Sequence, residues 1–416
     1  MNMTRMPSKD KVFPYFFCGI AYLLLIFLTN NFYTISDQTT YGAAGDSGNF
    51  LIIAGSVPYL PDGSYKMPSH HAERIASPYL VGIISHVFSI NFVDSFRLFS
   101  ILMTLGTILG LVLILRHLDV GWRGCLMAVI FWASCPYTLR YYLAFPAMGS
   151  DPMFIFGLSI LILGLLKVNL PLLLFANVFM IFARQTTLAT LPAVLIWFMA
   201  DKNWARYSLT ARLAFFASII GVDIGATQFL KWISAHYSIP SRSYLDHLYG
   251  IFPWIYDKGL NLQLVIFLIK GLTSISLPLS IVIGALALRR RSISGSTIGI
   301  LFLFLSLIAQ PYLAGPAISQ GSISRLNVIG FIPLLVLGFS LIPKQALDKI
   351  PIWLMASFAV LSFGYSSHPL VSIQGQWIGG RMFFLGVLGL TILAIFLVAG
   401  YFYFKLGRNG KFAATN

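Results

Sequence analysis

Long apolar runs separated by short polar segments recur along the whole chain. A helix needs about 20 apolar residues to cross a ~30 Å hydrocarbon core, because it rises ~1.5 Å per residue. The runs between 151 and 200 are shorter and are also compatible with tilted or partial hairpins. The pattern predicts an all-α, polytopic transmembrane protein with about 12 spans, to within about two. The predicted spans lie at about 12–32, 94–115, 124–142, 151–167, 169–183, 186–200, 209–232, 263–288, 297–313, 326–342, 351–364 and 382–404.

The composition agrees with this pattern. Of the 416 residues, 57% are hydrophobic and only 10% are charged, whereas soluble globular chains carry about a quarter charged residues. These values exclude a soluble enzyme, a secreted disulfide scaffold and a disordered chain. Cys18, Cys125 and Cys135 all lie in apolar stretches, and this odd number of cysteines predicts no disulfide framework.

The net charge of +15 is explained better by membrane topology than by a nucleic-acid partner, because no basic patch is interleaved with aromatic residues. When the spans are threaded from a cytoplasmic N-terminus, 17 of the 28 basic residues fall in short cytoplasmic segments, as the positive-inside rule requires. The first helix lacks a small-x-small cleavage site and is expected to remain uncleaved. We therefore expect a multi-pass protein of the cell inner (plasma) membrane with both termini in the cytoplasm.

The chain is expected to form a single membrane domain over 1–416, with cytoplasmic tails at 1–11 and 405–416. Three outward segments are long, and they lie at 33–93, 233–262 and 365–381. The first contains an amphipathic stretch from Asn49 to Val57 that is expected to lie along the membrane interface. Gly106 and Gly110 form a small-xxx-small pair that is typical of a helix-packing face.

Two outward acids are candidates for catalysis. Asp46 opens the amphipathic stretch in GDSGNF, and Asp151 opens an apolar run in GSDPMF. Each has the alternative role of capping a helix, because an acid in the first turn satisfies free N–H groups and proline is tolerated there. The functional alternative is a carboxylate at the water–lipid boundary that accepts a proton from a hydroxyl group.

Outward arginines are the matching candidates for binding an anion. They are Arg74, Arg184, Arg325 and, with the same ambiguity, Arg140 and Arg381. Each either extends to lipid headgroups or pairs with an anionic substrate.

Two other polar features have structural explanations beside functional ones. The adjacent His70 and His71 lack the spacing of a zinc site, so we expect them in a solvated loop. Asp223 lies inside a predicted span, either as a packed polar contact or as a proton-relay group.

The order of these motifs resembles the GT-C superfamily of membrane glycosyltransferases, which use polyprenyl-phosphate-linked sugars. An early loop acid is followed by a loop Arg-x-x-x-Pro, the run FVDSFRLFSILMTLGTILGLVLILRHL, an outer GSDP, an RQTT turn and a late RLNVIGFIPLL. The resemblance covers about 35–340. The compact length is most similar to bacterial enzymes that modify O-antigen, such as phage-type O-antigen glucosyltransferases. Many members carry two adjacent acids where this chain has only Asp46.

The resemblance implies a GT-C-like fold and specific roles. Asp46 would be the general base or would orient the acceptor, and Asp151 would help to hold the acceptor or donor sugar. Arg74, Arg184, Arg325 and Arg381 would contact the donor phosphate. No redox cofactor and no metal site are expected, although the need for a divalent ion is left open.

The implied reaction moves a hexose, glucose being favoured, from undecaprenyl or another polyprenyl phosphate to a hydroxyl of a lipopolysaccharide or similar lipid-linked glycan at the periplasmic face. The partners are then this donor, the glycan acceptor and the bilayer, without nucleic acid. Two alternatives remain: a transporter or flippase of lipid-linked sugar, and an O-antigen polymerase or ligase.

Overall fold

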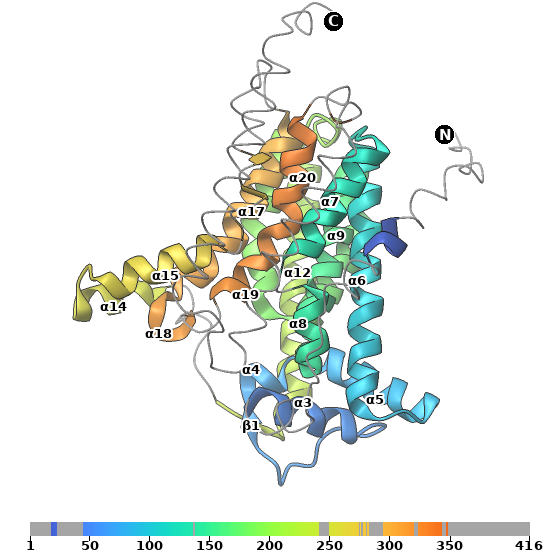
Figure 1. The fold of residues 1–416 in the computed structure, drawn as a ribbon, viewed down its shortest axis with the longest axis vertical. Coiled ribbons are helices and arrows are strands. Elements are labelled where there is room, and N and C mark those ends of the chain that lie inside the picture. Colours follow the sequence, from blue (N-terminus) through green and yellow to red (C-terminus); the bar gives the residue numbers. More distant parts are fainter. Residues whose placement is uncertain are drawn as a thin grey trace, which may run out of the picture.

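The computed structural model describes residues 18–22, 45–135, 138–240, 249–273, 294–319 and 323–342, together with 275, 278–279, 281–282 and 347. These residues form an elongated bundle of helices (Figure 1) with one two-stranded parallel ladder. The elements are α3 Gly45–Gly55, β1 Met67–Pro68, α4 Ser69–Ala72, α5 Ala76–Phe88, α6 Phe92–His117, α7 Trp122–Ser134, α8 Leu139–Ala144, η2 Pro146–Met148, α9 Ser150–Lys167, α10 Leu170–Ala183, η3 Gln185–Thr190, α11 Leu191–Ala200, α12 Leu209–Ser234, β2 Ser238–Ile239, α14 Ile251–Lys258, α15 Leu262–Thr273, α17 Gly295–Leu313, α18 Gly315–Ser319, α19 Ile323–Asn327, η4 Val328–Gly330 and α20 Phe331–Leu341.

Four of the described helices are long and apolar enough to cross a membrane, namely α6, α9, α12 and α17. Each coincides with a predicted apolar run, which confirms the all-α membrane fold class. Helices α10, α11, α15 and α20 match further runs but are shorter. The predicted spans at 351–364 and 382–404, most of 12–32 and the outward segment 365–381 lie outside the described residues, so the total of about 12 spans stays a prediction.

The predicted span at 124–142 is wrong as a single helix. Helix α7 ends at Ser134, and Cys135 adopts an extended conformation with ψ of 123°. Pro136 follows in the sequence, and the residue before a proline is disfavoured in the helical region because its backbone clashes with the proline ring. The chain resumes as the short helix α8, so two separate helices occupy the predicted span.

Side-chain caps mark where helices α6 and α17 begin. The Asn91 side chain accepts a hydrogen bond from the Asp94 backbone N–H at 2.9 Å, and Ser294 accepts one from Thr297 at 3.2 Å. Each cap satisfies a backbone donor that has no partner within its own helix. The polar residues between apolar runs therefore set the start of α6 and of α17.

Helix α9 lies between α6 and α10 at the centre of the bundle, and small residues allow this close packing. A Cβ atom added at Gly110 of α6 would lie 2.4 Å from Ser159 Oγ, and one added at Gly157 of α9 would lie 2.5 Å from Met180. Gly106 approaches Phe156 in the same way. The expected packing role of Gly106 and Gly110 is confirmed, with α9 as the partner helix.

The first and second outward segments fold together at one end of the bundle. Met67 pairs with Ser238 in the β1–β2 ladder, and the Lys66 ammonium donates to the backbone carbonyl of His236. Figure 1 shows α3, α4 and β1 at the same end of the bundle as α5, which adjoins the start of α6. Their contact supports the prediction that 33–93 and 233–262 share one side of the membrane.

Helix α12 buries one stripe and exposes the rest. Trp232 is 75% exposed, whereas Asp223 is completely buried and its two carboxylate oxygens have no hydrogen-bond partner in the described part of the chain. A helix with such an apolar outer face is stable when that face contacts lipid. Asp223 is therefore a buried acid inside a membrane-length helix, and both roles expected for it stay predictions.

The contact between α6 and α9 predicts unequal effects of two glycine substitutions. Gly110→Ala should lower the free energy of unfolding by about 1–3 kcal/mol, because the added methyl group overpacks the interface. Gly225→Ala on α12 is the matched control, because a Cβ there meets nothing within 4 Å. Thermal unfolding in one detergent measures both, and equal melting temperatures for the two variants would contradict the packing described.

Candidate functional site

A buried carboxylate between two arginines forms the centre of the site. Asp151 is 4% exposed and Arg184 is 5% exposed. One oxygen of Asp151, Oδ1, pairs with a terminal nitrogen of Arg184, and the other, Oδ2, lies 3.6 Å from Nε of Arg325. Because both oxygens face guanidinium groups, Asp151 fixes the positions of the two arginines.

Local backbone structure brings these side chains together. Asp151 is the second residue of α9, where Pro152 is tolerated because first-turn N–H groups have no partner in the helix. Arg184 follows the last residue of α10 and is extended, with φ of −158° and ψ of 137°. The α9–α10 hairpin thus places Arg184 beside Asp151. The carboxylate bonds to Arg184 and not to the helix N–H groups, so capping is not its role.

Arg325 reaches the same carboxylate from α19. Its terminal nitrogen Nη1 donates to the Tyr141 hydroxyl at 3.2 Å, and its guanidinium carbon lies 5.8 Å from the centre of the Tyr141 ring. Nη1 is also 3.4 Å from the sulfur of Met148. Residues of α8 and η2 therefore hold Arg325 in a fixed position over Asp151, partly through a cation–π contact.

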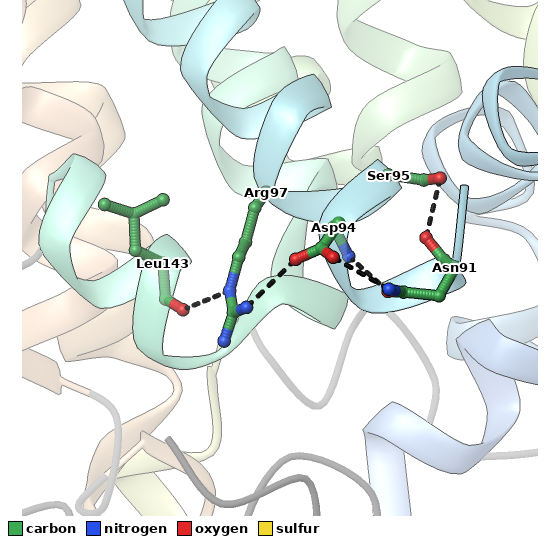
Figure 2. A network of polar contacts seen from close by, with 5 residues as sticks. All are labelled: Asn91, Asp94, Ser95, Arg97 and Leu143. Atoms are coloured by element: carbon green, nitrogen blue, oxygen red, sulfur yellow. Dashed lines mark hydrogen bonds and ion pairs between the residues drawn. The ribbon is translucent and has the colours of Figure 1, made fainter. Parts of the chain in front are cut away.

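Figure 2 shows how the start of α6 supports α8. Arg97 on α6 donates to the Leu143 carbonyl at 3.4 Å and to Asp94 at 3.1 Å. Asn91 in turn donates to the Asp94 carboxylate at 2.7 Å. Leu143 lies two residues after Tyr141, so this chain of contacts anchors the helix that carries the partner of Arg325.

Glu73 and Arg74 contribute a second pair of charges from the segment between α4 and α5. Gln185 donates from its side-chain amide to Glu73 Oε2 at 2.9 Å, and Gln185 directly follows Arg184 in the sequence. Arg74 lies close enough for its charge to act on both Glu73 and Asp151. Burial raises the pKa of Glu73, and the Gln185 hydrogen bond and the charges of Lys231 and Arg74 offset this only in part.

The electrostatic balance at this end of the bundle favours an anion. Arg184 and Arg325 pair with Asp151, and the charge of Arg74 acts on both Asp151 and Glu73. In the described part of the chain, the buried Nε–H groups of Arg184 and Arg325 have no hydrogen-bond acceptor. Buried donors of this kind are costly unless a ligand or water accepts from them.

The structure places only some of the expected site residues. Asp151, Arg184 and Arg325 come together, with Arg74 nearby. Asp46 is the second residue of α3, which contacts α4 and η2, although its side chain lies outside the described residues. The Arg140 side chain and the whole of Arg381 are outside them as well.

The expectation of two solvated histidines is wrong for His71. His71 is 4% exposed, and its ring lies 5.6 Å from the ring of Phe50 and 4.0 Å from that of His70. The cause is the contact between α3 and α4, which buries one face of the short helix. Within the described ranges, no three His, Cys, Asp or Glu residues are grouped to hold a metal ion.

Four residues of the site were not expected from the sequence: Glu73, Gln185, Tyr141 and Arg97. The only glutamate of the chain, placed next to an arginine, was a usable signal for Glu73. Gln185 belongs to the same RQTT turn as Arg184. By contrast, the contact between Tyr141 and Arg325 spans 184 positions, and no local pattern predicts it.

Comparison with known proteins gives distant structural matches. No protein-family model matches the chain, and no curated protein matches it. A cryo-EM structure of the mycobacterial arabinofuranosyltransferase AftD matches with a TM-score of 0.49 and 14% identity, over 89% of this chain and 27% of that one. A structure of an AftD mutant matches with a TM-score of 0.49 and 15% identity, over 88% and 28%. The chain thus spans about a quarter of the length of AftD.

The buried ion pair predicts a specific pattern of stability changes. Asp151→Asn should lower the free energy of unfolding by about 3–5 kcal/mol, because it leaves buried guanidinium groups without a counter-charge. Adding Arg184→Gln should recover part of this loss, since one uncompensated charge is removed. Thermal unfolding of the single and double variants measures the coupling.

Asp94→Asn is the matched control. Asp94 lies in the first turn of α6 and also pairs with an arginine, but its side chain is 56% exposed. Exposed pairs contribute up to about 1 kcal/mol. Strictly additive losses for Asp151→Asn and Arg184→Gln would show that the two side chains do not depend on each other.

Proposed function

We propose that this protein is a membrane glycosyltransferase that moves a sugar from a polyprenyl-phosphate donor to a cell-surface glycan. The observation that carries the proposal is the cluster of Asp151, Arg184 and Arg325, buried at one end of membrane-length helices. The order of motifs that resembles the GT-C superfamily, in which these three residues take part, also supports it.

The cluster suits the phosphate of such a donor. A sugar-linked polyprenyl phosphate is a phosphodiester with one negative charge, and the phosphate gains a second charge when the sugar leaves. Arginine offers planar, paired donors that match phosphate oxygens. Donors that are already positioned, here by Asp151 and Tyr141, stabilise this growing charge without reorganising during the reaction.

The location also suits the two substrates. The polyprenyl tail requires a hydrocarbon environment, which surrounds the exposed apolar faces of the long helices. The sugar and the acceptor require water, and Gly149, just before α9, lies against Phe96 and Phe99 near the start of α6, while η2 contacts α3 of the first outward segment. We propose that the lipid approaches between helices while the acceptor enters from the aqueous side.

The remaining roles extend this proposal. Asp46 orients the acceptor hydroxyl or accepts its proton, and Arg74 and Arg381 add positive charge near the phosphate. A hexose, with glucose favoured, is the proposed sugar, and a lipopolysaccharide O-antigen at the periplasmic face is the proposed acceptor. The proposed location is the cell inner membrane with both termini in the cytoplasm.

Asp223 favours a second candidate, a transporter or flippase of lipid-linked sugar. A buried acid inside a membrane-length helix is a common feature of ion-coupled transport. The arginine cluster at one end of the bundle fits a transferase better, because a carrier requires its binding site near the middle of the membrane.

The direct test reconstitutes the full chain in proteoliposomes with radiolabelled polyprenyl-phosphate hexose and lipopolysaccharide. We expect label to move to the polysaccharide through a new glycosidic bond. Passage of the intact donor between leaflets without a new bond would replace the transferase with the transporter.

Arg325→Ala should reduce kcat/KM for the donor by about 10- to 100-fold, which corresponds to a charge-assisted hydrogen bond of about 1.5–3 kcal/mol. Arg206→Ala is the control, because Arg206 is an exposed arginine in the predicted cytoplasmic segment between α11 and α12. An unchanged dependence of rate on donor concentration in Arg325→Ala would remove Arg325 from phosphate binding.

A further inference from the structure

Glu73 is a second acid at the site, and its surroundings differ from those of Asp151. It follows α4 directly and precedes α5, so it lies on the outward segment next to the arginine cluster. It is half-buried and is the only glutamate in the chain. Its carboxylate accepts a hydrogen bond from the side-chain amide of Gln185, the residue that follows Arg184.

The hydrogen bond from Gln185 engages only one oxygen of Glu73. Gln185 Nε2 donates to Oε2 at 2.9 Å, and this is the one side-chain hydrogen bond to Glu73 within the described part of the chain. Both oxygens of Asp151, by comparison, face guanidinium groups. A carboxylate held on both oxygens by cations is a weak base, so Asp151 is poorly suited to accept a proton.

Charged and titratable groups on the neighbouring described segments interact with Glu73. Arg74 is its chain neighbour, and Lys231 acts on it from the last turn of α12. The hydroxyl of Tyr237 donates to the Ala72 carbonyl at 3.3 Å, and the charge of Glu73 raises the pKa of this tyrosine in addition to the effect of burial. Desolvation is the largest influence on Glu73 and raises its pKa, which makes it a stronger base than a solvated carboxylate.

We infer that Glu73 is the residue that accepts the proton of the acceptor hydroxyl during sugar transfer. The inference rests on the proposed function and deepens it. The O–H bond of the acceptor breaks and its proton passes to Glu73 Oε1, while the acceptor oxygen forms a bond to the anomeric carbon. The bond between that carbon and the phosphate oxygen breaks, and its electron pair stays on the phosphate beside Arg184 and Arg325. Asp46 then orients the acceptor, which is the other role open to it.

The test compares pH–rate profiles of the reconstituted full chain. In the wild type, kcat should fall as the pH drops through the raised pKa of Glu73, because only the deprotonated form accepts a proton. Glu73→Gln should lower kcat by about 10²- to 10⁴-fold, leave the donor KM within about threefold, and abolish the acidic limb of the profile.

Two further variants separate chemistry from structure. Gln185→Ala should move the acidic limb to higher pH, since it removes a hydrogen bond that lowers the pKa of Glu73. Asp46→Asn should reduce transfer but keep the acidic limb, because Glu73 remains. Gln185→Ala retains the Glu73 carboxylate, so it keeps the test decisive even if Glu73→Gln fails to fold.

The outcomes also separate this inference from the proposed function. If the wild type transfers sugar and Glu73→Gln retains both its kcat and its acidic limb, the inference is overturned and the glycosyltransferase stands. The inference is overturned equally by an acidic limb that disappears in Asp46→Asn and stays in place in Gln185→Ala. If the wild type forms no glycosidic bond from any polyprenyl-phosphate sugar, the proposed function fails, and the inference fails with it.

Discussion

The burial of Asp151 between Arg184 and Arg325 is the constraint on which the rest of the site depends. Two arginines placed in a low-dielectric interior repel each other and lose hydration, so the arrangement is stable only with a carboxylate between them. That carboxylate must come from a rigid element, and the first turn of α9 provides one at the centre of the bundle. Small residues at the α6–α9 and α9–α10 contacts let the helices that carry the cluster pack closely.

The same constraint explains why Asp151 and Glu73 have different environments. Asp151 neutralises and positions arginines, and this role leaves it no free oxygen. Glu73 is half-buried beside the cluster, where the Gln185 amide donates to one of its oxygens. A reaction that needs both a cationic surface for a leaving phosphate and a base for an incoming hydroxyl requires these two environments side by side.

The sequence was sufficient for the elements that depend on local pattern. The apolar run at 94–115 predicts α6, observed at Phe92–His117, and the run at 151–167 predicts α9, observed at Ser150–Lys167. The end of α7 before Pro136 could also have been predicted from the sequence, because a proline restricts the residue before it. Hydrophobicity averaged over a window of residues does not show this break. The alternation of spans and the distribution of basic residues placed Asp151, Arg184 and Arg325 on one predicted side of the membrane, and the structure brings the three side chains together.

Contacts between distant segments could not be predicted in this way. Arg184 and Asp151 are 33 residues apart and meet through a hairpin, whereas Glu73 and Gln185 are 112 residues apart and meet only in the tertiary structure. A carboxylate in a first turn has the same sequence signature whether it caps the helix or binds an arginine. Only the positions of Arg184 after α10 and Arg325 on α19, next to the first turn of α9, decide between these roles.

The central claim is that the buried arginines bind the phosphate of a lipid-linked sugar. Its most direct test is the equilibrium binding of radiolabelled, sugar-free polyprenyl phosphate to the full chain in nanodiscs. We predict saturable binding to the wild type and to Arg206→Ala, and a loss of at least tenfold in affinity when Arg184 and Arg325 are both replaced by glutamine. Equal affinity of this double variant, measured on folded protein, would contradict the account.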